Sequence, residues 1–291
     1  MKLPSRPVFY SALAVVFLAI SGGMLCENAM HIPASFRKVD PEAWVRGLGV
    51  KGEHVEIRSG DGYRLRGTLF RPREPNGAAV IGLHGVADWR RGVTGQASLL
   101  LRHNYTVLAP DSRGHGLSEG EPVTYGVKER DDVRRWTEWL VERTGSPRLY
   151  GFGQSMGAAI LAEATAVQPR FRAIVADSCF YDFLSIGVDR LGANRLLAAP
   201  FLYPALMYAR VRYGVNLTEV SPVAALGRSR TPALLIHGSR DNNIRPWHSQ
   251  RLHEAHPEFT QLWQPEADHV NAVALHGAEY ERQVVEWLSL H

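Results

Sequence analysis

The feature that most constrains the fold of this chain is the segment Gly151-Phe152-Gly153-Gln154-Ser155-Met156-Gly157. An apolar run ends at Phe152, and the residues from Ala158 to Ala164 have the composition of a buried helix. Ser155 is therefore expected at a sharp turn from a strand into a helix, where close backbone contact requires glycine two positions before and two positions after it. Such a turn holds the hydroxyl at the positive end of the helix dipole, a geometry suited to acyl transfer.

A motif of this kind also arises by chance in a chain with 27 glycines, so its interpretation depends on the rest of the sequence. Residues 54–58 and 63–70 alternate between apolar and polar and predict an antiparallel hairpin. Strands and helices then alternate to the end of the chain. We expect strands at 78–83, 105–109, 149–152, 173–176, 233–236 and 260–263, and helices at 94–103, 125–143, 156–164, 249–254 and 278–290. This order predicts an α/β fold with a doubly wound, mainly parallel sheet.

The block from Cys179 to about Arg230 interrupts this alternation. It contains the aromatic and apolar segments 181–184 and 196–208. Because it lies between two strand ends, where ligands bind in open α/β sheets, we expect a small helical cap over the site. Packing as ordinary core is the alternative.

The N-terminus carries an uncharged span of about eighteen residues, Val8 to Leu25, after Lys2 and Arg6. It predicts a single transmembrane helix with the catalytic domain outside the cytoplasm. A secreted protein released by signal cleavage is the alternative, and lipid attachment at Cys26 is disfavoured by the bulky residues before it. We therefore divide the chain into a signal anchor at 1–26, a connecting segment at 27–50, and an α/β domain at 51–291 with its cap insertion at about 179–230.

Two loops after predicted strands carry further candidates. His84-Gly85-Val86 follows one strand, and we expect the backbone N–H of Val86 and that of Met156 to form an oxyanion hole. His84 is expected to fix this loop. The turn from Asp111 to Ser118 is interpreted as structural, with an internal Asp–Arg pair, and a catalytic His115 is the alternative.

The last two strands are followed by an acid and a histidine. Asp241 comes after a strand and a His-Gly-Ser turn, and His269 lies in the loop after the final strand. Two other carboxylates compete to serve His269. Asp268 is its immediate neighbour, but adjacent side chains in an extended loop point apart. Asp177 ends the strand that follows the Ser155 helix.

In this order these motifs make the chain from about Val55 to Leu290 resemble the α/β-hydrolase superfamily, in particular monoacylglycerol-lipase-like and prolyl-oligopeptidase-like serine hydrolases. The resemblance implies esterase, lipase, thioesterase or peptidase chemistry without a cofactor. It implies Ser155 as nucleophile, Asp241 as acid and His269 as base. The expected substrate is a small-molecule or lipid-like acyl compound, cleaved through an acyl-enzyme.

Other functions are less well supported by the sequence. Arginines are scattered among acids at a net charge of +4, so nucleic-acid binding is not expected. No spacing typical of a metal site appears among the candidate residues, and no metal is expected. The alternatives are a serine peptidase or acyltransferase with the same triad, and a catalytically silent, membrane-tethered binding protein.

Overall fold

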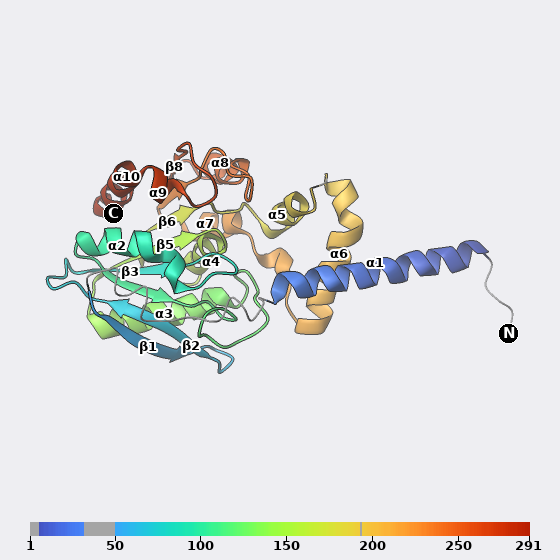
Figure 1. The fold of residues 1–291 in the computed structure, drawn as a ribbon, viewed down its shortest axis with the longest axis horizontal. Coiled ribbons are helices and arrows are strands. Elements are labelled where there is room, and N and C mark those ends of the chain that lie inside the picture. Colours follow the sequence, from blue (N-terminus) through green and yellow to red (C-terminus); the bar gives the residue numbers. More distant parts are fainter. Residues whose placement is uncertain (1–5, 32–49, 193) are drawn as a thin grey trace.

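The computed structural model describes residues 6–31, 50–192 and 194–291, and for residues 6–13 it describes the helix without its side chains. Most of the predicted connecting segment, residues 32–49, lies outside this description. The first element described is the long helix α1 (Arg6–Met30), which projects from a sheet-containing body (Figure 1). Residues 6–26 of the predicted anchor and residues 27–30 of the predicted connecting segment thus form one continuous helix.

The body is built on one eight-stranded sheet of order β1-β2-β4-β3-β5-β6-β7-β8. β1 and β2 form the expected hairpin, β2 is antiparallel to β4, and the remaining pairs are parallel. The predicted mainly parallel sheet is therefore confirmed. The strands are β1 (Gly52–Arg58), β2 (Arg64–Phe70), β3 (Ala78–Leu83), β4 (Thr106–Pro110), β5 (Arg148–Gln154), β6 (Phe171–Asp177), β7 (Ala233–Ile236) and β8 (Thr260–Trp263).

Helices cover both faces of the sheet, which explains why the central strands are almost entirely apolar. Along β3, Val80 and Ile81 belong to two separate cores, because successive side chains point to opposite faces. One core includes residues of α3 and α4, and the other includes residues of α2 and α10. The helices of the body are η3 (Arg90–Val93), α2 (Thr94–Arg102), α3 (Glu129–Thr144), α4 (Met156–Thr165), α7 (Pro222–Ser229), α8 (Trp247–Ala255), α9 (Ala272–Leu275) and α10 (Gly277–Leu290).

The expected helical insertion between β6 and β7 contains α5 (Phe183–Arg190), α6 (Arg195–Tyr213) and the short η4 (Leu217–Glu219). Together with α1, these helices form a third core, separate from the two cores of the sheet. α1 crosses α6 beside the body (Figure 1). The cap is therefore made from two parts of the sequence, and only the insertion was expected from the sequence.

Within the part of the chain whose side chains are described, no helix is long and apolar enough to cross a membrane. The predicted transmembrane helix at the N-terminus is thus not supported. Residues 8–13 of the predicted span lie outside the described side chains. Beyond Leu25, α1 carries Glu27 and Asn28, and its last turns pack into the cap instead of continuing an apolar run.

Candidate active site

Ser155 occupies the single position between the end of β5 and the start of α4. Its φ of 53° places it in the left-handed region, which is uncommon for a residue other than glycine. A Cβ at Gly153 would lie 2.5 Å from the carbonyl oxygen of Gly157, and one at Gly157 would lie 2.4 Å from that of Leu83. Both flanking glycines are therefore required by close backbone contact, as the sequence motif predicts.

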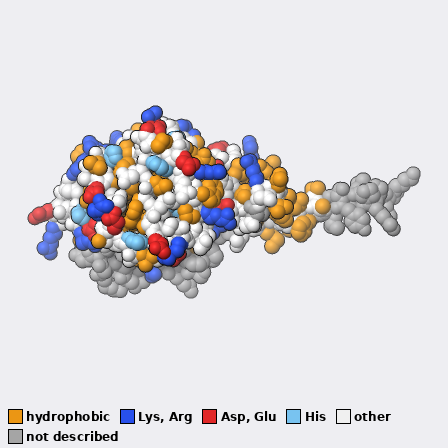
Figure 2. Space-filling view, turned by 90° about the horizontal axis from the view of Figure 1, so that it is seen from above, with side chains coloured by type: hydrophobic (Ala, Val, Ile, Leu, Met, Phe, Trp, Pro, Cys, Tyr) orange, Lys and Arg blue, Asp and Glu red, His pale blue; other side chains and the backbone are white. Residues whose placement is uncertain are grey.

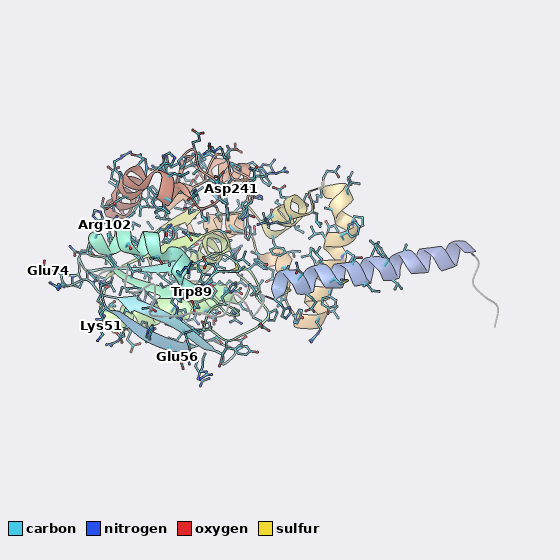
Figure 3. All side chains as sticks on the ribbon, viewed as in Figure 1. Lys51, Glu56, Glu74, Trp89, Arg102 and Asp241 are labelled. Atoms are coloured by element: carbon cyan, nitrogen blue, oxygen red, sulfur yellow. The ribbon has the colours of Figure 1, made fainter. Side chains whose placement is uncertain are left out.

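The structure brings Ser155, His269 and Asp241 together from three loops at the carboxyl ends of parallel strands. His269 Nε2 lies 3.0 Å from Ser155 Oγ, and His269 Nδ1 lies 2.7 Å from Asp241 Oδ2. An ionised carboxylate only accepts hydrogen bonds, so Nδ1 carries a proton in this arrangement and Nε2 is free to accept one from the serine hydroxyl. Figure 3 shows Asp241 on the side of the body that faces α5, whereas Glu74 and Arg102 lie at the other end.

Asp241 is held by its own loop. Its Oδ1 accepts hydrogen bonds from the backbone N–H groups of Asn243, at 2.8 Å, and Ile244, at 2.9 Å. Burial raises the pKa of Asp241, but hydrogen bonds from His237 and His269 outweigh it and hold the pKa below its ordinary value. The carboxylate is therefore ionised at neutral pH and available to His269.

The two competing carboxylates are engaged elsewhere. Asp177 is fully buried and accepts hydrogen bonds from the hydroxyls of Tyr280, at 3.1 Å, and Ser178, at 3.2 Å. Burial raises its pKa to about 6. Asp268 is exposed. The carboxylate that accepts the hydrogen bond from His269 Nδ1 is thus that of Asp241.

The expected oxyanion hole lies beside the serine. Val86 and Met156 line the same cavity as Ser155, and Met156 is the first residue of α4. A Cβ built on Gly85 would lie 3.5 Å from the Cβ of Ser155, so the loop after β3 passes directly over the nucleophile position. The amino-terminal end of α4 contributes positive potential at this point.

His84 fixes the loop that carries Val86, in line with its expected role. Its Nδ1 lies 2.8 Å from the carbonyl oxygen of Gly85, and its Nε2 accepts a hydrogen bond from the backbone N–H of Ser112 at 3.0 Å. His115 packs edge-on against the His84 ring. Burial, followed by the proximity of His84, lowers the pKa of His115 to about 4. Both imidazoles are therefore neutral and structural.

The expected pairing of Asp111 with an arginine inside its own turn is wrong. Asp111 binds Arg90 in a buried ion pair at 2.6 Å, and Arg113 binds Asp132 at 2.7 Å. A buried charge needs a partner, and Asp111 and Arg113 each take their ion-pair partner from another element. The turn is structural, but it joins η3 and α3 to the sheet.

A cavity of about 440 Å³ opens above Ser155. Its walls are mainly apolar, as expected for a site that binds a hydrocarbon chain. One wall comes from α5 and α6, and another comes from the last turns of α1. The lining includes Leu25, Cys26, Ala29, Met30, Phe180, Phe183, Ile186, Leu202, Ala205, Leu206 and Leu217, with Tyr125, Arg190 and Asn243 as polar members.

The contribution of α1 was missed in the sequence, where the segment was interpreted as an anchor. A signal was present, because Leu25, Cys26, Ala29 and Met30 lie on one helical face at the end of the uncharged span and just after it. In the described parts of the chain, no group of three or more His, Cys, Asp or Glu side chains is arranged to hold a metal ion.

Comparison with known proteins supports the α/β-hydrolase fold. Residues 78–193 match the alpha/beta hydrolase fold family. The uncharacterized protein YqkD of Bacillus subtilis is 28% identical over 267 residues, covering 90% of this chain and 84% of the relative. The uncharacterized protein YfhR of Escherichia coli is 29% identical over 259 residues, covering 85% of this chain and 82% of the relative.

Solved structures of other proteins have the same fold. The esterase Pf2001 of Pyrococcus furiosus has 25% sequence identity and a TM-score of 0.72, with 89% of this chain and 97% of the esterase covered. The acylaminoacyl peptidase of Pyrococcus horikoshii, at 14% identity and a TM-score of 0.64, shares the fold over 87% of this chain and 43% of its own length. The sheet order, the strand-turn-helix at Ser155 and these similarities together support the α/β-hydrolase superfamily, and the chain has the α/β-hydrolase fold.

Proposed function

We propose that this hydrolase is a serine esterase that cleaves carboxylic esters with an apolar acyl group through an acyl-enzyme. The observation that supports it most is the continuous hydrogen-bond chain from Ser155 through His269 to Asp241 at the base of an apolar cavity. The similarity to an esterase structure over 89% of the chain supports the same substrate class.

The proposed reaction follows from this geometry. Ser155 Oγ attacks the ester carbonyl carbon while His269 Nε2 takes its proton, and Asp241 stabilises the imidazolium. The N–H groups of Val86 and Met156 stabilise the carbonyl oxygen as it becomes negative. His269 then gives its proton to the leaving alcohol, which leaves Ser155 acylated. A water molecule, activated by His269 in the same way, releases the acid and restores the serine.

The test is covalent labelling of the full-length protein with a fluorophosphonate, together with hydrolysis of p-nitrophenyl esters. We expect wild type to be labelled and Ser155→Ala to lose both labelling and hydrolysis with an unchanged circular dichroism spectrum, because the labelled oxygen is absent. A Ser155→Ala protein that is still labelled would contradict the assignment. An unlabelled wild type would favour the silent binding protein.

Peptidase activity is a second candidate, because the uncharacterized peptidase YuxL of Bacillus subtilis is 26% identical over 206 residues. This match covers 65% of the present chain but only 30% of the relative. Comparing p-nitrophenyl esters with p-nitroanilides of the same acyl group separates the two activities. A higher kcat/KM on the anilides would assign the peptidase.

We also propose that the protein attaches to a lipid bilayer through α1 and α6. Large apolar side chains of both helices are exposed, and Figure 2 shows hydrophobic side chains gathered towards the projecting end of the molecule. Exposed arginines on α6 add positive charge that suits anionic lipids. We call this surface the cap face; it comprises Val15, Val16, Phe17, Ile20 and Met24 of α1 and Leu196, Leu197, Phe201, Tyr203, Met207 and Val211 of α6.

A further inference from the structure

α1 is packed into the cap by close backbone contact. A Cβ on Gly22 would lie 2.6 Å from Cβ of Pro204 and 2.7 Å from the backbone N of Ala205. One on Gly23 would lie 3.3 Å from the ring of Tyr208. Only glycine lets the two helices approach this closely, so the Gly22-Gly23 pair marks a built helix–helix interface.

Polar contacts fix the end of α1 to both the cap and the body. Glu27 Oε1 accepts hydrogen bonds from the hydroxyls of Tyr208, at 2.7 Å, and Tyr213, at 2.6 Å. On the body side, the Tyr125 hydroxyl donates to the carbonyl oxygen of Ala29 at 2.5 Å. The backbone carbonyl of the last residue of α1 accepts a hydrogen bond from the N–H of Val123 at 2.9 Å. The end of the helix therefore has a defined position relative to the nucleophile.

The fixed end of α1 faces the site. Leu25, Cys26, Ala29 and Met30 line the cavity that contains Ser155. Met30 is completely buried, whereas Met24 on the other side of the same helix is 69% exposed. Methionine is a flexible side chain that fills irregular apolar space. Its size and that of Ala29 therefore affect how much of the cavity a hydrocarbon chain can occupy.

We propose that the last two turns of α1 form a wall of the acyl pocket and that Met30 and Ala29 determine which acyl-chain lengths are accepted. This inference rests on the proposed esterase function. It names the part of the substrate that the enzyme distinguishes, which is the length of the acyl chain. It makes the N-terminal helix part of the substrate site and not only an attachment.

The experiment measures kcat/KM of the full-length protein on p-nitrophenyl esters from two to twelve carbons. Met30→Ala removes three heavy atoms from the wall, so the preferred acyl chain should lengthen by two or three carbons and the ratio of long-chain to acetate kcat/KM should rise about tenfold. Ala29→Phe fills the same space and should shorten the preferred chain. Met24→Ala is the matched control: the same substitution on the exposed side should leave the profile unchanged.

Leu25→Ala, at a half-buried lining position, serves if Met30→Ala does not fold. Its profile should also move towards longer chains. Folded Met30→Ala or Leu25→Ala proteins with the wild-type profile, or an equal shift in Met24→Ala, would overturn the proposal.

A second measurement separates this inference from the esterase assignment. Calorimetry measures the binding of saturated fatty acids of graded length to the Ser155→Ala protein. It reports which chain lengths the pocket accepts in the absence of catalysis. If wild type hydrolyses no ester but Met30→Ala still moves the preferred fatty acid to a longer chain, the wall is correct and the reaction is not. Active enzyme with unchanged fatty-acid and ester profiles would refute the wall alone.

Discussion

At the scale of single residues, the identity of the acid that serves His269 has a direct consequence. Asp241→Asn places an amide where the carboxylate accepts from Nδ1, which favours the wrong imidazole tautomer and can lower kcat about ten-thousandfold in a triad of this kind. We expect a loss approaching that size on a p-nitrophenyl ester. Asp268→Asn, an exposed change one residue from the histidine, is the control and should stay near wild type.

This assignment fails if the losses are reversed. Asp177→Asn should cost much less than Asp241→Asn, because Asp177 contacts Tyr280 and Ser178. A crippled Asp177→Asn enzyme beside a nearly normal Asp241→Asn enzyme would move the acid to the end of β6.

The raised pKa of Asp177 leads us to expect that the stability of the protein depends on pH. Burial raises its pKa from 3.8 to about 6, so between these values the folded protein keeps a proton that the unfolded chain has lost. Its contribution to stability is therefore complete below pH 4 and disappears as the pH rises through 6. Asp177→Asn lacks this titration. The difference in free energy of unfolding between wild type and Asp177→Asn should change by about 2 kcal/mol from pH 4 to pH 7, in favour of the variant.

Urea unfolding of both proteins at several pH values measures this difference. The subtraction removes the titration of the other acids that both chains share. A difference that is constant with pH, or that moves in favour of wild type as the pH rises, would show that folding does not raise the pKa of Asp177.

At the scale of elements, the sequence predicts those turns and strands that depend only on neighbouring residues. The turn at Ser155 follows from the glycines on either side, and the buried strands follow from runs such as 78–83. The partners of Asp111 and Arg113 do not follow from the turn that contains them, because η3 and α3 supply them. Ion-pair partners in a core depend on how separate elements meet, and periodicity carries no information about that.

In the cap, too, the sequence predicts the helices but not how they pack together. The apolar pattern between Cys179 and Arg230 predicts helices there, and α5 and α6 occupy that insertion. The packing of α1 against α6 joins segments about 180 residues apart in sequence, as the contact between Glu27 and Tyr208 shows. The same apolar composition suits a bilayer and a protein core. Hydrophobicity alone therefore did not distinguish a helix that lines a pocket from one that spans a membrane.

At the scale of the whole molecule, one cap carries both a pocket wall and the cap face. The inner side of α1 reaches the cavity above Ser155, and its outer side adds to an exposed apolar surface shared with α6. If the cap face rests on lipid, the cavity lies next to the phase in which hydrophobic esters dissolve. Membrane attachment and apolar substrate preference would then be two results of the same packing.

This arrangement predicts binding to vesicles through the cap face. The full-length protein should float with vesicles of phosphatidylcholine and phosphatidylglycerol at three to one, because burying exposed apolar side chains in lipid contributes about 1.5–3 kcal/mol each. Phe17→Asp combined with Val211→Asp removes one such side chain from each helix and should lower the bound fraction by at least tenfold. Leu290→Asp, an equally polar change at an exposed apolar residue of α10, is the matched control and should bind like wild type. Added salt should weaken wild-type binding, because the arginines of α6 are exposed and their attraction to anionic lipid is screened.

Wild type left at the bottom of the gradient, or full flotation of the double variant, would count against the cap face as the attachment surface. Neither outcome bears on the pocket wall, which the ester and fatty-acid profiles test separately.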